Sequence, residues 1–252
     1  MRLTRHQCEK DNKPATKSED YQYIGKKVNE SLAYTYFYPV TKVKGDYLIH
    51  FPWENESQFR RRFLSSYAST ALSYPQQTAD EGLLHEVEFL SPRTLDEGNQ
   101  VYLVGYVFEK GCDSEWTKAW QQACHQLQFG GERGYGWGDV RCVEMKSLEK
   151  QDDKYDLFNG QADFIDNQDQ PIIQIQAKRL LAHASSAKGL IATGEIEPLV
   201  GREWKVSNQA GQHVEQFCSD LCWVPGSVVE QSLHFKIANF GLWHDTDQRD
   251  FR

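Results

Sequence analysis

The stretch that most constrains this chain runs from Phe129 to Gly138 and places five glycines among one acidic residue, one arginine and two further aromatic residues. Glycine adopts positive φ angles and leaves the backbone open to close approach. Consecutive exposed amide groups form concavities suited to phosphate. Arg133 can hold a phosphate group, and Tyr135 and Trp137 offer stacking faces, a combination used on single-stranded nucleic acid. The alternative is a hairpin loop or a tight helix exit that binds nothing.

The candidate contact residues of this glycine-rich loop are Gly130, Gly131, Arg133, Gly134, Tyr135, Gly136, Trp137 and Gly138. Two familiar phosphate loops are excluded by spacing. Gly131 to Gly136 fits the start of a P-loop, but Trp137 and Gly138 stand where Lys and Ser or Thr are required. The dinucleotide fingerprint fails because the loop leads into Asp139-Val140-Arg141, which predicts a strand where that fingerprint needs a helix. We therefore expect no nucleotide cofactor.

Composition indicates a globular chain. Its 252 residues, 39% hydrophobic and 25% charged, suffice for one large domain or two small ones. No apolar run approaches the length of a membrane span, and the first residues lack the apolar segment of a signal peptide. We therefore expect a cytoplasmic protein with no membrane contact. The net charge of −8 means that any contact with phosphate is local, because such affinity comes from clustered Lys and Arg.

Cysteine usage predicts reduced thiols without a metal site. Cys218 and Cys222 lie close together in sequence and near His213, as half of a zinc site would, but no second ligand pair has zinc-finger spacing. The alternative to a zinc site at this pair is that both thiols are buried in the core. The full set is Cys8, Cys112, Cys124, Cys142, Cys218 and Cys222.

Residues 1–30 are polar and aperiodic, which predicts an N-terminal arm. Beyond them we expect a strand ending at Pro39, a strand at 47–51 and a helix capped by Asn55 or Ser57 that continues to Tyr67. Arg60, Arg61 and Arg62 would form its solvated face, with contact to RNA or a partner as the alternative.

Two further strands, 83–90 and 100–108, are expected to pair as a hairpin. A helix capped by Asp113 or Ser114 should place Trp116 and Trp120 in the core and continue to Leu127, and a strand should follow the loop at 140–145. This order is close to the β-α-β-β-α-β ferredoxin-like plan, whose sheet is also the RNA platform of RRM domains.

Two motifs in this order carry a family resemblance. The segment Glu81-Gly82-Leu83-Leu84-His85-Glu86 precedes the strand pair, and Leu127 to Val140 holds the glycine-rich loop between the second helix and the last strand. Residues 31–146 thereby resemble the RAMP superfamily of CRISPR-associated proteins. The resemblance implies a Cas5-like or Cas7-like subunit of a type III effector complex, because the loop lies in mid-chain as in the Csm4, Cmr3 and Csx10 relatives.

That resemblance implies a non-catalytic subunit that holds the crRNA, at its 5′ handle, together with a Cas7-like backbone and a Cas10-like large subunit. The alternatives are an RNA endonuclease, by Cas6-like repeat processing or Cas7-like target cleavage, and a subunit that serves assembly alone. Histidine is the usual general base for RNA cleavage, but His50, His85, His183 and His234 have no diagnostic sequence neighbours. We assign no catalytic residue.

The second half of the chain is expected to be β-rich. Residues 147–170 are polar and acidic, which predicts a linker. Residues 171–252 contain several strand-like segments that form either a second, degenerate ferredoxin-like half or extensions of the first. The predicted fold class is therefore α+β.

Overall fold

The computed structural model describes residue 28 and residues 31–73, 78–79, 82–150, 154–165, 171–186, 189–199, 201–204, 214–218, 221–231, 233–238 and 241–246. This part of the chain is α+β, with two α-helices and many short strands. Its contacts define two compact units, Tyr36–Tyr106 and a second made of Met1–Thr35 with Val107–Arg252. No helix within the described ranges has the length and apolar character to cross a membrane. The predicted N-terminal arm, residues 1–30, lies outside them except for residue 28, and the predicted domain boundaries stay predictions.

A three-stranded antiparallel sheet forms the core of the smaller unit. β2 (Tyr38–Val43) lies between β3 (Asp46–Ile49) and β8 (Tyr102–Val104). The prediction that a strand ends at Pro39 is wrong, because β1 is confined to Leu32–Tyr34 and Pro39 lies inside β2. Proline cannot donate a ladder hydrogen bond, but its carbonyl accepts one from the His50 amide at 2.9 Å.

Aromatic rings fill the space beside this sheet. Phe51 stacks on Trp53 with ring centroids 4.9 Å apart, and Tyr38 meets both rings edge-on. Phe63 is almost fully buried at the end of α3 and lies 4.9 Å from the ring of His50. These contacts fix α3 to the sheet through one apolar face, as the spacing of Phe59 and Phe63 predicts.

Helix α3 (Glu56–Phe63) begins as predicted and ends early. The Asn55 side chain caps it by accepting a hydrogen bond from the Gln58 amide at 3.0 Å. The predicted continuation to Tyr67 is wrong, because Leu64 adopts an extended conformation and starts β4 (Leu64–Ser69). Pairing with a distant strand has overridden helical periodicity here.

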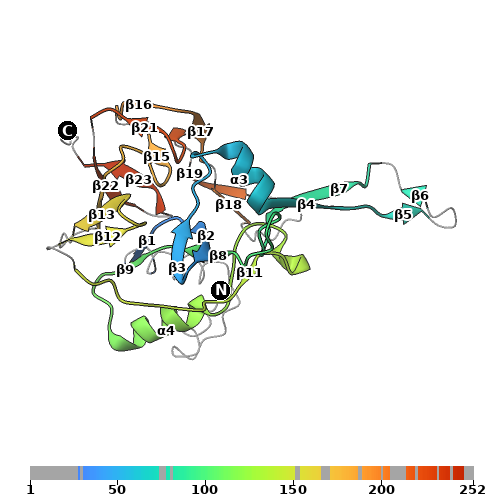
Figure 1. The fold of residues 1–252 in the computed structure, drawn as a ribbon, viewed down its shortest axis with the longest axis horizontal. Coiled ribbons are helices and arrows are strands. Elements are labelled where there is room, and N and C mark those ends of the chain that lie inside the picture. The colour runs from blue at the N-terminus through green and yellow to red at the C-terminus, as the bar shows by residue number, and fades with distance from the viewer. Residues whose placement is uncertain are drawn as a thin grey trace. The chain divides into compact units, whose positions relative to one another are not determined.

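A two-stranded ribbon leads out from α3 (Figure 1). In it β4 pairs with β7 (His85–Leu90), and β5 (Leu72–Ser73) pairs further out with β6 (Thr78–Ala79). The predicted hairpin between 83–90 and 100–108 is therefore wrong: β7 pairs with β4, and β8 with β2. The alternating pattern identified both strands but could not identify their partners.

In the larger unit, β1 pairs with β9 (Val107–Glu109) and α4 spans Ser114–Cys124. Asp113 caps α4 through the Trp116 amide at 2.7 Å. Trp116 and Trp120 are buried, as predicted, and the Trp120 indole donates to the Glu109 carboxylate. The helix ends three residues before the predicted Leu127.

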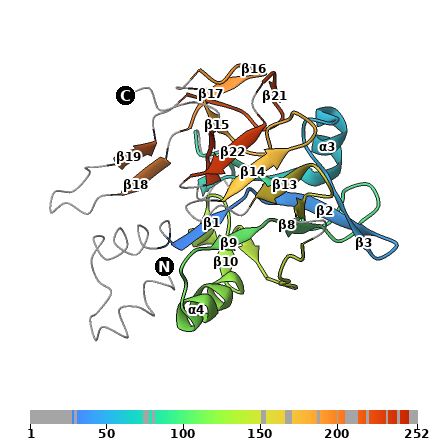
Figure 2. The same ribbon diagram turned by 90° about the vertical axis from the view of Figure 1, so that its left-hand side faces the viewer.

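An eight-stranded sheet dominates the second half of the chain and confirms that this half is β-rich. Figure 2 shows β13, β14 and β22 side by side within it. Alternate residues of β14 and β22 are buried, among them Ile173, Ile175, Phe235 and Ile237. In order across the sheet the strands are β12 (Tyr155–Leu157), β13 (Ala162–Ile165), β14 (Ile172–Ile175), β22 (His234–Ile237), β23 (Trp243–Asp245), β15 (Ala184–Ser185), β20 (Leu221–Trp223) and β17 (Ile196–Pro198).

Two smaller strand pairs complete this region. β16 (Ala192–Thr193) pairs with β21 (Val228–Val229), and β18 (Gly201–Trp204) with β19 (Val214–Cys218). Both pairs are antiparallel.

Candidate functional site

The glycine-rich loop connects the two strands of a short hairpin. β10 (Leu127–Gln128) pairs with β11 (Asp139–Val140), and the Phe129 amide donates to the Gly138 carbonyl at 2.9 Å. The predicted strand after the loop is therefore present but ends at Val140, and residues 141–150 carry no regular structure. All eight candidate residues, Gly130, Gly131, Arg133, Gly134, Tyr135, Gly136, Trp137 and Gly138, lie within this one connection.

Three glycines of the loop are held at positive φ, where other residues are strained: Gly130 at 80°, Gly136 at 89° and Gly138 at 74°. At Gly138 space is also lacking, because an added Cβ would overlap the Phe129 carbonyl oxygen and lie 2.9 Å from its carbonyl carbon. Gly138 therefore closes the hairpin by close backbone approach.

The remaining glycines face open space. An added Cβ at Gly130, Gly131, Gly134 or Gly136 would meet nothing within 4 Å. A 3-10 turn, Arg133–Tyr135, forms the middle of the loop, and the Tyr135 amide donates to the Glu132 carbonyl at 2.9 Å. These four glycines are exposed, and contact between their backbone and a ligand stays a prediction.

The aromatic residues of the loop differ in exposure. Tyr135 is 85% exposed, whereas Trp137 is half-buried. The backbone of Arg133 lies in the 3-10 turn, but its side chain is outside the described part of the structure, so its phosphate contact stays a prediction. Tyr135 is consequently the side chain best placed for stacking on a ligand.

Charge near the loop is balanced. Glu132 and Asp139 offset Arg133 and Arg141 in sequence. Clustered cations therefore cannot be the main source of affinity for a polyanion. Exposed glycine backbone and the exposed aromatic face of Tyr135 are what this hairpin offers a ligand.

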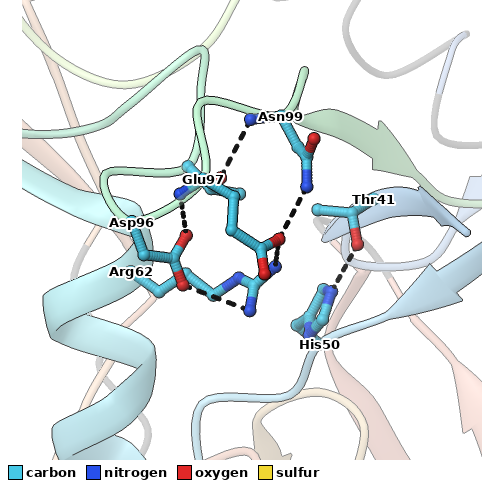
Figure 3. A network of polar contacts seen from close by, with 7 residues as sticks. Thr41, His50, Arg62, Asp96, Glu97 and Asn99 are labelled. Carbon is cyan, nitrogen blue, oxygen red and sulfur yellow. Dashed lines mark hydrogen bonds and ion pairs between the residues drawn. The ribbon is translucent and has the colours of Figure 1, made fainter.

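A second polar cluster lies at the end of α3, in the smaller unit (Figure 3). Arg62 contacts the Asp96 carboxylate at 3.2 Å and the Glu97 carboxylate at 3.1 Å. The Asn99 side chain donates to Glu97 at 2.7 Å. Arg62 thereby fastens the turn at residues 94–99 to the helix, and the Leu95 amide adds a bond to the Arg62 carbonyl at 2.9 Å.

This cluster shifts the pKa values of two of its members. Burial, followed by the positive charge of Arg62, lowers the pKa of His50, although Asp96 acts in the opposite direction. Burial alone would raise the pKa of Asp96, but hydrogen bonds from Glu97 and Thr94 and the charge of Arg62 lower it. His50 also lies 2.8 Å from the Thr41 hydroxyl. We interpret the cluster as structural, because ion pairs and hydrogen bonds join Arg62, Glu97 and Asn99 to one another, while Arg62 Nε is buried without a hydrogen-bond partner among the described residues.

The three arginines of α3 have different surroundings. Arg60 forms an ion pair with Glu88 at 2.6 Å, and Arg62 belongs to the cluster above. Arg61 is exposed and bonds to the Ser57 carbonyl of its own helix at 3.2 Å. The prediction that all three form a solvated face thus fits Arg61 better than Arg62.

The histidines considered as catalysts lie on separate elements. His183 contacts Glu197 at 2.6 Å, His234 belongs to β22 and His85 to β7. Within the described residues no group of three or more His, Cys, Asp and Glu side chains could hold a metal ion. Cys222 is buried and forms no disulfide among the described residues, while His213 and the side chain of Cys218 lie outside the described part.

No protein family, no curated protein and no solved structure matches this chain. The resemblance drawn from the sequence motifs therefore stands on those motifs alone.

Proposed function

We propose that this chain is a non-catalytic subunit of a type III CRISPR effector complex that holds the guide RNA, in a Cas5-like position at the 5′ handle. The observation that carries the proposal is the exposed glycine-rich hairpin loop with Tyr135 at its surface. Its open amide groups suit phosphate and its tyrosine suits an unpaired base. A Cas7-like backbone and a Cas10-like large subunit would be its partners.

The order of elements supports the ferredoxin-like part of this proposal. β2, β3, α3, β7, β8, α4, the loop and β11 occur in this order along the chain, with β4–β6 before β7 and with β9 and β10 on either side of α4. β7, β8 and β11 lie in three separate sheets, whereas the ferredoxin-like plan joins its strands in one. The ribbon pairing of β4 with β7 differs from that plan. The loop still follows the second helix and leads into a strand, which is one of the two motifs that carry the resemblance; the segment 81–86, which leads into β7, is the other.

The experiment is to purify the tagged chain from its native host, extract the bound nucleic acid and sequence it. The isolated chain is incubated in parallel with labelled repeat RNA. Bound processed guides and no cleavage are expected. Specific cutting of the repeat would instead move the assignment to a Cas6-like nuclease.

A matched pair of variants tests the loop itself. Stacking of one base on an aromatic side chain contributes about 1–3 kcal/mol, so Tyr135→Ala should weaken RNA binding about 5- to 150-fold. Tyr67→Ala, which removes another exposed tyrosine, 55% exposed on β4, should leave binding unchanged. Equal effects of the two substitutions would contradict a role for the loop.

The ribbon favours a second candidate function, assembly without RNA contact. Leu72, Leu83 and Leu84 are exposed along it, Leu84 by 73%. Residues 64–92 contain four acidic residues and no Lys or Arg, which makes them a poor partner for phosphate. A two-stranded ribbon is marginally stable alone, so a protein neighbour would stabilise it.

These two functions are separable by nuclease treatment of the purified complex. If assembly is the function, neighbouring subunits stay bound after the RNA is digested, and Leu83→Ser with Leu84→Ser releases them. If the loop holds the guide, Tyr135→Ala lowers RNA content while the ribbon variant leaves RNA binding by the isolated chain intact.

A further inference from the structure

The chain that leaves the glycine-rich hairpin runs past the end of its partner strand. β11 ends at Val140, which faces Leu127, the first residue of β10. The chain before Leu127 turns into α4, where the Gln126 amide donates to the Ala123 carbonyl at 3.0 Å. From Arg141 onward the chain therefore continues β11 without a partner strand among the described residues.

Residues 141–150, here called the exit segment, lie at the surface. All of them except Cys142 are exposed, and they belong to no sheet of the described part of the chain. Val143 is 64% exposed, and Met145 and Leu148 are exposed as well. Exposed apolar chain that continues a strand is a template for pairing with another chain.

The centre of the exit segment has the side-chain spacing of a strand. Lys146 Nζ contacts Glu144 Oε1 at 2.8 Å, so these two side chains lie on the same side of the backbone. Residues two positions apart share one face of an extended chain, whereas in a helix they point in different directions. No helix, turn or bend occurs between residues 141 and 150. Val143 and Met145 accordingly share the opposite face.

The charges of the exit segment are complementary to those of a second copy. A two-fold symmetric antiparallel pair places one residue opposite its own copy. With Met145 in that position, every charged residue from 141 to 149 faces an opposite charge. Centring the pair on Glu144 or on Lys146 instead puts like charges opposite each other, which is destabilising. In the register centred on Met145 the facing residues are Arg141 and Glu149, Cys142 and Leu148, Val143 and Ser147, and Glu144 and Lys146, each pair occurring twice.

This register also separates apolar from charged contacts. Val143 and Met145 of both copies form the centre of one face, and Arg141 with Glu149 forms its rim. Glu144 and Lys146, already an ion pair within one copy, meet the same two residues of the other copy on the opposite face.

We propose that the exit segment is the interface of a symmetric dimer, in which it pairs antiparallel with the exit segment of a second copy in the register centred on Met145. Main-chain hydrogen bonds join the two segments, and the interface is isologous. One short strand pair is a small interface, so association is weak and depends on protein concentration. The proposal goes beyond the function proposed above and does not depend on the ligand of the glycine-rich loop.

Sedimentation of the full chain over a range of concentrations tests the dimer. The mass should rise from the 29.2 kDa of one chain towards twice that value. Glu144→Lys and Lys146→Glu should each weaken dimerisation about tenfold or more, because two facing pairs then carry like charges. Lys118→Glu, which changes an exposed lysine of α4, should dimerise like the parent.

Mixing the two weakened variants provides the decisive control. The Glu144→Lys chain faces the Lys146→Glu chain with opposite charges at both positions, so the mixture should dimerise again. This restoration also shows that both variants are folded. A mass of 29.2 kDa at every concentration, a dimer insensitive to both charge reversals, or a mixture that stays monomeric would overturn the proposal.

Two cysteine variants test the register. Met145→Cys places two thiols opposite each other, so oxidised glutathione should link the copies. Ser147→Cys places its thiol four residues along the pair from its copy, about 13 Å at about 3.3 Å per residue, which is too far for a disulfide. The parent chain gives the background from the native cysteines. Equal linkage of Met145→Cys and Ser147→Cys, or linkage of Met145→Cys no greater than that of the parent, would overturn this register.

Discussion

Replacement of Gly138 by alanine should open the glycine-rich hairpin. The residue has φ of 74°, and an added Cβ would overlap the Phe129 carbonyl oxygen. A left-handed conformation costs an alanine about 1–2 kcal/mol. Displacing the Phe129 backbone also breaks its 2.9 Å hydrogen bond to Gly138, which contributes about 1 kcal/mol. The two costs add to a loss of about 2–3 kcal/mol in the stability of the hairpin. The hairpin has only two residue pairs to offset this loss.

Hydrogen exchange of peptides covering residues 127–140 measures this local loss, and urea unfolding shows whether it spreads. Gly136→Ala is the matched control, because its φ is also positive but its surroundings are open; it should cost about 1 kcal/mol. Gly134→Ala, with open space and no positive φ, should be neutral or slightly stabilising. The reasoning is refuted if Gly138→Ala exchanges no faster than Gly136→Ala.

Three further predictions concern stability elsewhere. Burial and the charge of Arg62 lower the pKa of His50 in the folded chain, so on acidification the imidazole takes up its proton more readily in the unfolded chain. The free energy of unfolding should therefore fall as the pH falls below about 6.5. Urea unfolding of the His50→Gln variant at several pH values should show a shallower fall. Arg62→Ala should clearly lower the urea midpoint, whereas Arg61→Ala should stay within about 0.5 kcal/mol of the parent; equal midpoints would contradict the role given to the cluster. Trp120→Ala should cost about 3–5 kcal/mol and Trp120→Phe markedly less, since phenylalanine keeps most of the packing and loses the bond to Glu109; thermal unfolding of the two variants distinguishes packing from hydrogen bonding.

Local chemistry made the helix starts predictable from the sequence. Asn55 and Asp113 cap α3 and α4 as their side chains predict. The burial of Trp116 and Trp120 followed from helical spacing. The α+β class and the β-rich second half followed from the alternation of apolar residues.

Pairing between distant segments was not predictable in the same way. Leu64–Ser69 continues the apolar spacing of α3, yet it becomes a strand because it pairs with His85–Leu90. Pro39 is typical of a strand end, yet it lies inside β2, where its carbonyl accepts a hydrogen bond from the His50 amide. Such choices depend on contacts that no local pattern encodes.

The candidate loop was located by composition, and its geometry adds what composition lacks. The sequence identifies all five loop glycines, but only the structure separates Gly138, which permits close backbone contact, from Gly131 and Gly134, which face open space. The Arg62 cluster was missed because its acidic partners follow 34 and 35 residues later, in a turn that the sequence marks only as turn-rich.

Ultraviolet cross-linking of the RNA-bound chain, followed by mass spectrometry, tests the central claim most directly. The tryptic peptide Gly134–Arg141 contains both Tyr135 and Trp137. We predict that this peptide carries the main nucleotide adduct and that Tyr135→Ala reduces it. Adducts confined to other peptides, with Gly134–Arg141 unmodified, would contradict the claim that the glycine-rich loop holds the guide RNA.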